Sequence, residues 1–422
     1  MVGGAGRLSS QEAAATLGVK PATLYAYVSR GLLGRHKTPA GSTFDATEVA
    51  RVAASAGRRG SVGRSGAGPA FATALTLIED GHLSYRGLDA VELSRHRRFE
   101  DVAWWLWTGS WPQQERWESN DGRAASARVT TAGLGPTAAP IDRVKMAVVA
   151  AGSADALRGD LSRGAVTATA RDLLTIVVDT LPAVGRRRRG ESIAERLWLR
   201  LSPLSPTPER VSLLDAALVL MADHELAPST LCARVAAAFG ADPYSVVSTG
   251  LGPASGPLHS AAANEVHRLF DDALARDPIA AIGERLARAE PIRGLGVRLY
   301  PDGDPRGREL LARLDDLAMD PQRRAVVDAV VAVAAGRDLD PPNVDFGLGA
   351  LAFGTQMIPG AGQAITIVGR MAGWLAHAME EYESRTVFRT RATYVGDRPG
   401  SASTDPASTD PALRPPSPPW ST

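Results

Sequence analysis

"GAGQAITIVGRMAGWLAHAMEEYES", residues 360–384, predicts one long helix. Together with other stretches that have helical periodicity, it decides the fold class. Residues 208–225, PERVSLLDAALVLMADHE, begin at a proline next to a glutamate, which is typical of a helix start. Residues 321–336, PQRRAVVDAVVAVAAG, also begin at a proline and continue with apolar residues. Few stretches alternate as strands do, so we predict an all-α body with a helix-bundle core.

Two stretches near the start of this body refine the prediction. Residues 71–87, FATALTLIEDGHLSYRG, alternate and contain an Asp-Gly step, which together are typical of a β-hairpin. Residues 99–109, FEDVAWWLWTG, place large apolar side chains on one face and end at a glycine, which predicts a helix. We therefore expect one hairpin ahead of a run of helices.

Charge divides the chain into two unlike parts. Its 422 residues are long for one domain and predict two or three, and the overall net charge is only +1. Residues 1–64 hold nine Lys or Arg and three Asp or Glu, a net charge of +6, so the remainder carries −5. A basic head on an acidic body indicates two partners of different kinds.

Several classes of protein are excluded by composition. Cys232 is the only cysteine, which rules out an internal disulfide and fits a reducing cytoplasm. The N-terminus has no apolar signal region, and the longest apolar runs are too short to span a bilayer. No group of Cys and His has metal-ligand spacing, so we predict no metal site.

The composition along the chain predicts four segments. A compact basic head covers residues 1–56, and a Gly-, Ser- and Arg-rich linker covers 57–68. The helical body covers 69–395. Residues 396–422 contain the duplication ASTDPASTDPA and many prolines, so we expect a disordered tail.

The head predicts two short helices joined by a tight turn. Ser9 or Ser10 can cap the first helix, with Glu12 in its first turn. Gly18 ends that helix, and Pro21 begins the second, where its missing N–H costs nothing. The outer face of the second helix would carry Lys20, Thr23, Tyr25, Tyr27 and Arg30.

This segment, RLSSQEAAATLGVKPATLYAYVSRGLLGR (7–35), resembles the helix-turn-helix of the MerR and excisionase-like DNA-binding families. Residues 41–54, GSTFDATEVARVAA, resemble the wing and next helix of those domains. The resemblance implies that the second helix enters the major groove of duplex DNA. The alternative is a helix-turn-helix that serves as a protein-packing module.

One histidine in the body has two interpretations. His259 stands in GPLHSAAANEV (256–266), after a Gly-Pro step and before an alanine-rich stretch with helical character. A lone histidine at a loop–helix junction is usually structural, but a helix start also favours a neutral imidazole that can donate a hydrogen bond. The stretch alone leaves both interpretations open.

A set of motifs in the body resembles the citrate synthase family, including 2-methylcitrate synthases. These motifs are MADHELAPST (221–230), GPLHSAAANEV (256–266), RGLGVRLYPDGDPRGREL (293–310), PPNVDFGLGAL (341–351), TIVGRMAGWLAHAMEE (366–381) and FRTRATYVG (388–396). The start of the body, residues 76–112, is also similar to the family. The resemblance implies large and small helical domains, the small one covering roughly 259–345 and closing over the site.

The resemblance also implies a reaction. The family condenses an acyl-CoA with a 2-oxo acid and releases CoA, with no cofactor besides the acyl-CoA substrate. Asp345 matches the family's base, and His259 matches the histidine that stabilises the enol oxygen. Taken alone, an aspartate that follows Pro342 and Asn343 is also typical of a helix N-cap.

Four further residues match the part of the family's site that binds the oxo acid. His224 matches a histidine that contacts the acid, and Arg306, Arg370 and Arg389 match three arginines that hold its carboxylates. Guanidinium suits this task because it forks onto a carboxylate with two hydrogen bonds. The family supplies the last arginine across a dimer interface, so the resemblance implies a homodimer.

The motifs depart from the family at several positions. Met221 replaces the first histidine of the family's HADHE phrase, and Arg337 is the one basic residue in AGRDLDPPNVD, ahead of PNVD. A third departure bears directly on the chemistry. Val297 stands where the family has a histidine that polarises the ketone of the oxo acid, and valine has no donor. Three interpretations follow. The first is a slower citrate or methylcitrate synthase with another donor near Val297. The second is a condensing enzyme for a different oxo acid, with Val297 shaping an apolar pocket. The third is a weakly catalytic protein that senses acyl-CoA or oxaloacetate and acts on DNA through its head.

Overall fold

The structure is a computed structural model, and it describes residues 7–16, 28, 34–38, 41–45, 49, 71–112, 116–184, 191–288 and 290–384. The chain divides into two compact units, Met1–Ala70 and Phe71–Thr422. The predicted linker (57–68) and tail (396–422) lie outside the described residues.

The first unit contains a short helix and a small antiparallel sheet. Helix α1 (Ser10–Thr16) follows strand β1 (Arg7–Ser9), and β2 (Arg35–Thr38) and β3 (Gly41–Asp45) complete a sheet of order β1-β3-β2. The Ser9 hydroxyl accepts from the Glu12 backbone N–H (3.3 Å), and the Glu12 carboxylate accepts from the Ser9 N–H (2.8 Å). The predicted cap at Ser9 is therefore confirmed.

A small apolar cluster lies under this sheet. It consists of Ala13, Phe44 and Val49, with Leu8 and Val28 packed against it. The residues proposed to read DNA (Lys20, Thr23, Tyr25, Tyr27 and Arg30) lie outside the described residues.

The second unit begins with the predicted hairpin and continues as helices. Strands β4 (Thr76–Glu79) and β5 (His82–Tyr85) are antiparallel around the Asp80-Gly81 turn, and the short β6 (Leu88–Asp89) extends the sheet. The helices are α4 (Ala90–His96), α5 (Phe99–Thr108), α6 (Asp121–Ala132), α7 (Pro140–Ser153), α8 (Arg163–Asp179), α9 (Ile193–Leu201), α10 (Pro208–Met221), α11 (Pro228–Ala238), α12 (Pro243–Ala254), α13 (Ala262–Ala275), α14 (Pro278–Ala287), α15 (Pro305–Asp315), α16 (Pro321–Gly336), α17 (Val344–Gly354) and α18 (Ala361–Ser384).

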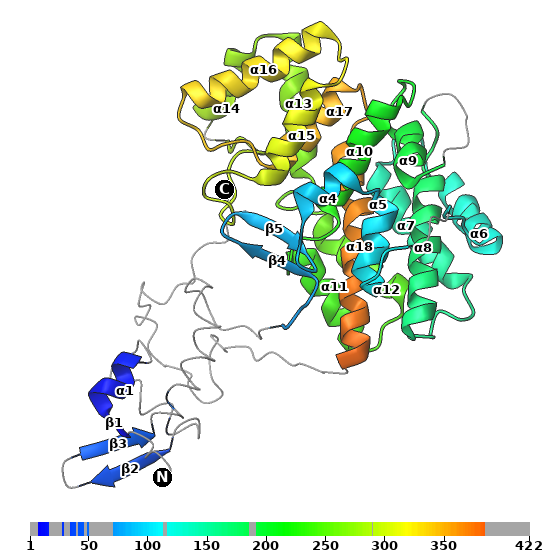
Figure 1. Cartoon of the computed structure of the whole chain (residues 1–422). Helices are drawn as coiled ribbons and strands as arrows, with labels where there is room; N and C mark the ends of the chain where they lie inside the picture. The colour runs from blue at the N-terminus through cyan, green and yellow to red at the C-terminus, as the bar shows by residue number, and fades with distance from the viewer. Residues whose placement is uncertain are drawn as a thin grey trace, which may run out of the picture. The chain divides into compact units, whose positions relative to one another are not determined.

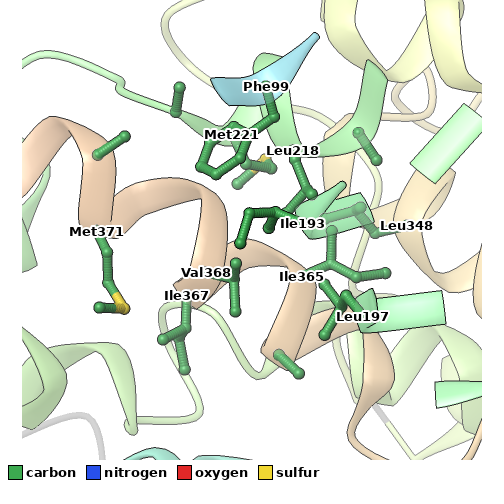
Figure 2. Close-up of a cluster of buried hydrophobic side chains, with 14 of the residues drawn as sticks. Phe99, Ile193, Leu197, Leu218, Met221, Leu348, Ile365, Ile367, Val368 and Met371 are labelled. Atoms are coloured by element: carbon green, nitrogen blue, oxygen red, sulfur yellow. The ribbon is translucent and has the colours of Figure 1, made fainter. Parts of the chain in front are cut away.

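Helix α18 lies in the middle of this unit, with α5, α8, α10, α11 and α12 around it (Figure 1). Most of its side chains are buried on every face, which is why its sequence reads as apolar throughout. Ile365, Val368 and Met371 pack with Phe99 and Leu218 in the main core (Figure 2). The predicted helix-bundle core is confirmed, with the stretch at 360–384 at its centre.

Helices α13 to α17 pack on one another beside this bundle, and α13 and α17 also contact α18 (Figure 1). Helices α15 and α17 approach closely because each presents a glycine. A Cβ added to Gly307 would lie 2.5 Å from the backbone of Asn343, and one added to Gly347 would lie 2.9 Å from Leu310. This close approach places the starts of two helices next to each other.

One helix boundary differs from the prediction. The segment predicted as helical to residue 225 leaves the helix after Met221, because Tyr85 holds the chain that follows. The Tyr85 hydroxyl donates to the carbonyl of Val219 or Asp223, both 3.1 Å away. Residues 222–227 therefore form a turn between α10 and α11. Within the described ranges, no helix has both the length and the apolar content that crossing a membrane requires.

Candidate active site

Asp345 lies in the first turn of α17. The Asn343 side chain caps this helix, because its Oδ1 accepts hydrogen bonds from the backbone N–H groups of Asp345 (2.9 Å) and Phe346 (3.3 Å). The interpretation of Asp345 as the helix cap is therefore wrong, since Asn343 already fills that position. The Asp345 carboxylate does not serve the helix and is available to a ligand.

The environment of Asp345 suits a base. Burial raises the pKa of Asp345 to about 6, and the Asp304 carboxylate adds to this, while Arg306 and Arg370 oppose it. A carboxylate of this kind is ionised at neutral pH but holds a proton more strongly than an exposed one. Such a group can remove a proton and later return it.

Asp304 joins Arg306 to the start of α17. Its Oδ1 accepts from the Arg306 backbone N–H and from Nε (both 3.0 Å), and its Oδ2 accepts from Nη2 (2.8 Å). The same Oδ2 accepts from the backbone N–H of Val344 (3.0 Å). Both Asp304 and Arg306 are almost fully buried. Asp304 therefore fixes the Arg306 guanidinium against the backbone of Val344, the residue that precedes Asp345.

His259 lies in the turn that leads into α13. Its Nε2 is 2.8 Å from the hydroxyl oxygen of Ser229, and the indole N–H of Trp374 donates to that same oxygen (3.3 Å). The Ser229 hydroxyl can accept from Trp374 and at the same time donate its own proton to His259 Nε2. In this tautomer the ring proton sits on Nδ1, which leaves an N–H donor for a ligand.

The imidazole of His259 is neutral, as the sequence predicts, but for a different reason. Burial, followed by the positive charge of Arg370, lowers the pKa of His259 to about 4. Burial is the larger cause of this shift, and helix α13 begins at Ala262, three residues after His259. A neutral N–H donor beside a base is the arrangement needed to stabilise an enolate oxygen.

His224 lies in the turn after α10 and contacts a residue that sequence reasoning did not single out. Its Nε2 is 2.9 Å from the hydroxyl of Tyr300, which is only 2% exposed. Burial and then the charges of Arg306, Arg370 and His259 lower the pKa of His224 well below its ordinary value. The structure thus brings His224, His259, Arg306, Arg370 and Asp345 into one site.

Arg370 comes from the middle of α18. Its Nε donates to the carbonyl of Met221 (2.9 Å), and the side chain is 3% exposed. Burial lowers the pKa of Arg370, while Asp223 and Tyr85 oppose this. Unlike Arg306, it forms no ion pair with a carboxylate among the described residues. A buried guanidinium in this state is suited to bind an anionic ligand.

A second group of residues missed by sequence reasoning lies beneath His224. The Asp223 carboxylate accepts from the Thr76 hydroxyl (2.5 Å) and lies 3.1 Å from His377 Nε2. The other ring nitrogen of His377 lies 2.9 Å from Arg234 Nη1. Burial raises the pKa of Asp223, but His377 and Arg370 outweigh it, so the pKa lies below its ordinary value. His377 stands among apolar residues in the stretch WLAHAM (374–379), and this was the available signal for the network.

Val297 is half-buried in a loop next to α17. Gly296 N–H donates to the carbonyl of Pro341 (2.9 Å), and Asn343 N–H donates to the carbonyl of Gly294 (2.8 Å), so the two loops run together. The Tyr300 N–H donates to the carbonyl of Val297 (3.0 Å). The Val297 side chain offers no hydrogen bond at this position. Arg389, the last arginine in the predicted set, lies outside the described residues.

The fold and this site define a class of enzyme. A base of raised pKa and a neutral histidine can form a carbon nucleophile next to an acyl group, and a buried cation can hold an anionic acceptor. The five site residues, His224, His259, Arg306, Arg370 and Asp345, come from five different segments of the helical body. The chain belongs to the citrate synthase family, because the family model for the C-terminal domain of citrate synthase matches residues 67–391.

Relatives of known name agree with this membership. The chain is 28% identical to citrate synthase 2 of Bacillus subtilis, over 78% of this chain and 94% of that protein. It is 29% identical to 2-methylcitrate synthase 2 of Corynebacterium glutamicum, over 77% of this chain and 92% of that protein.

Solved structures share the fold. Citrate synthase from Thermotoga maritima aligns with a TM-score of 0.63 and 23% identity, over 81% of this chain and 96% of that chain. The citrate synthase of Thermoplasma acidophilum was solved as a ternary complex with carboxymethyl coenzyme A and oxaloacetate. It aligns with a TM-score of 0.63 and 22% identity, over 78% of this chain and 94% of that chain. The predicted fold class of the body is confirmed.

Proposed function

We propose that the chain is a condensing acyltransferase that joins acetyl-CoA, or another short acyl-CoA, to oxaloacetate or a related 2-oxo acid and releases CoA. The observation that carries this proposal is the pairing of Asp345, with a pKa of about 6, and the neutral His259, in one site with the buried Arg370. Membership in the citrate synthase family supports the same reaction. The reaction needs no cofactor besides the acyl-CoA substrate.

The proposed steps use each group once. Asp345 removes a proton from the carbon next to the thioester carbonyl, and His259 donates its Nδ1–H to the enolate oxygen. The enolate carbon then attacks the ketone carbon of the oxo acid, so a new carbon–carbon bond forms while the C=O π bond breaks. The resulting alkoxide takes up one proton, which balances the proton that Asp345 removed. Water cleaves the thioester of this product, which releases CoA as a thiol and leaves a carboxylate.

The oxo acid is held by His224, Arg306, Arg370 and Arg389, the last from a second copy of the chain, so the working form is a homodimer. Exposed apolar side chains support a second copy. Val149 on α7 is 60% exposed, Phe239 at the end of α11 is 63% exposed, and Leu231 and Val235 on α11 are also exposed. Both helices pack on α12, and covering such side chains favours association.

A direct assay tests the reaction. Free thiol should appear when the protein receives acetyl-CoA or propionyl-CoA together with one of a panel of 2-oxo acids, and not without the oxo acid. Asp345→Asn and His259→Ala should abolish release, while His96→Ala, an exposed histidine on α4, should not change it. If the wild-type chain releases no thiol with any member of the panel, the enzyme proposal is wrong and the sensor interpretation replaces it.

We further propose that the head binds duplex DNA, and that the protein resides in a reducing cytoplasm, which its single cysteine supports. The net charge of +6 on residues 1–64 supports DNA binding, as does the β2–β3 hairpin where the resemblance expects a wing. Affinity for a duplex should fall steeply as salt rises. Lys20→Glu with Arg30→Glu should abolish binding in a fluorescence anisotropy titration.

The matched control for this titration places the same charge change on the body. Arg128→Glu with Arg268→Glu alters two exposed arginines of α6 and α13 and should leave DNA affinity nearly unchanged. Negligible binding by the wild-type chain at low salt would favour the packing-module interpretation of the head.

A further inference from the structure

The proposed reaction needs a hydrogen-bond donor that position 297 does not provide. When the enolate attacks the ketone, negative charge develops on the ketone oxygen, and a preorganised donor lowers the barrier. Val297 cannot supply one. The donor must therefore come from a side chain near the loop that carries Val297, and that loop ends at Tyr300, which bonds to His224.

The pair of Tyr300 and His224 is held from several sides. The Tyr300 backbone is tied to Val297 by a turn hydrogen bond of 3.0 Å, and the Arg306 guanidinium lies 5.5 Å from the centre of its ring. Arg306 is itself fixed by two hydrogen bonds to Asp304. The hydroxyl of Tyr300 therefore meets His224 Nε2 in one defined position, 2.9 Å away.

The direction of this hydrogen bond follows from the acidities of the two groups. Burial raises the pKa of Tyr300 to about 12, so the hydroxyl keeps its proton, and His224 is neutral because its pKa is lowered. An imidazole nitrogen is a better acceptor than a phenol oxygen, so Tyr300 donates and Nε2 accepts. The proton of the His224 ring then sits on Nδ1. This nitrogen has no partner among the described residues.

We propose that Tyr300 is a positioning residue that holds His224 in its Nδ1–H form, and that His224 thereby donates a hydrogen bond to the ketone oxygen of the 2-oxo acid in place of the histidine absent from position 297. This inference rests on the proposed function. It assigns to His224 a role in polarising the ketone, beyond contact with the acid. It also explains how Val297 is compatible with a site that retains Asp345 and His259.

The first test reads the tautomer directly and does not need turnover. The full chain is labelled with ¹⁵N-histidine, and the His224 signals are assigned by comparison with His224→Gln. We expect Nε2 to have the chemical shift of an unprotonated nitrogen and Nδ1 that of a protonated one. Tyr300→Phe should mix the two tautomers. A protonated Nε2 in the wild-type chain would overturn the inference.

The second test reads the ketone of bound oxaloacetate by infrared difference spectroscopy. Polarisation weakens the C=O bond, so its stretching frequency should be lower in the wild-type complex than in water. Tyr300→Phe should lose much of this shift while still binding oxaloacetate. Tyr382→Phe is the matched control, because it removes another hydrogen-bonded hydroxyl, a partly buried one that donates to the carbonyl of Ala241. An equal shift in wild type and Tyr300→Phe would contradict the proposal.

The third test is kinetic and separates this inference from the proposed function. Tyr300→Phe should lower kcat by about ten- to a hundredfold with little change in KM, which is less than the hundred- to thousandfold typical of deleting a donor itself. Val297→His should raise kcat with oxaloacetate and reduce the loss caused by Tyr300→Phe, because a second donor is then present. If wild type releases CoA and Tyr300→Phe releases it equally fast, only this inference fails. If wild type releases no CoA, the proposed function fails. The tautomer and infrared tests then still decide whether Tyr300 positions His224 as proposed.

Discussion

Burial moves three side chains of the site toward their neutral forms, although their ordinary pKa values differ widely. It raises the pKa of Asp345 to about 6, lowers that of His259 to about 4 and raises that of Tyr300 to about 12. A low dielectric penalises the charged form of every group, so one cause produces a stronger base and two neutral donors. The arginines retain their charge in the same surroundings because guanidinium loses its proton only at very high pH.

These pKa values predict the pH dependence of the reaction. Asp345 must be ionised to act as the base, so kcat/KM should rise as pH increases through about 6 and then level off. His259 is already neutral over this range and should add no further step. Steady-state measurement of CoA release between pH 5 and 8 checks this. A rate that is constant down to pH 5 would show that no group with a pKa near 6 acts as the base.

The sequence predicted site residues whose role depends on the type of the residue itself. It did not predict residues whose role depends on contacts that only the fold creates. The motifs predicted His224, His259, Arg306, Arg370 and Asp345, and the structure brings all five together. Ser229, which orients His259, gave no signal because its contact spans thirty residues of chain. Asp223 stood in a quoted motif, but its partner His377 lies on α18, and only the fold brings them together.

Turns between helices and the first turns of helices, rather than helix interiors, place most of the working groups. His224 follows the end of α10, and the next residue, Glu225, has φ +49°, which non-glycine residues seldom adopt. Its carboxylate accepts from the backbone N–H of Ile78 on β4 (2.9 Å). The helical pattern predicted a helix through this turn because tertiary contacts with the hairpin, absent from local sequence, end α10 at Met221. Helix interiors such as 360–384 were predictable because burial alone explains them.

At the scale of elements, the contact between helices α15 and α17 aligns Arg306 with Asp345. Gly307→Ala should push Asn343 away, because the new Cβ would lie 2.5 Å from its backbone. We expect a lower free energy of unfolding and a loss of activity larger than the loss of stability explains, since Asn343 caps the helix of Asp345. Thermal unfolding and CoA release, measured on the same sample, check this.

Gly283→Ala is the matched control for that substitution. Gly283 lies within α14, and no atom lies within 4 Å of the position that its Cβ would occupy. Replacing a helical glycine with alanine at an open position typically stabilises by about 0.5–1 kcal/mol. Equal behaviour of the two variants would show that the close approach of α15 and α17 does not position the site.

At the scale of the whole molecule, the charges of the site bear on the proposed homodimer. Oxaloacetate has two carboxylates. Arg306 is already paired with Asp304, so Arg370 is the arginine of the site that lacks a carboxylate partner among the described residues. Under the proposed function, Arg389 from a second copy supplies the further cation that balances the ligand. The exposed apolar side chains of α7 and α11 supply a reason for two copies to associate.

Complementation between two inactive variants tests whether the site is shared. Asp345→Asn and Arg389→Ala should each be inactive as homodimers. In a hybrid dimer, however, the intact Asp345 of one subunit and the intact Arg389 of the other belong to the same site. Equal coexpression makes about half of the dimers hybrid, each with one working site, so activity should recover to about a quarter of wild type. The control pairs Asp345→Asn with His259→Ala, whose residues belong to one chain, so every site of that hybrid keeps one defect and no activity should return. Absence of recovery in the first pair would place Arg389 in the site of its own subunit or outside the site altogether.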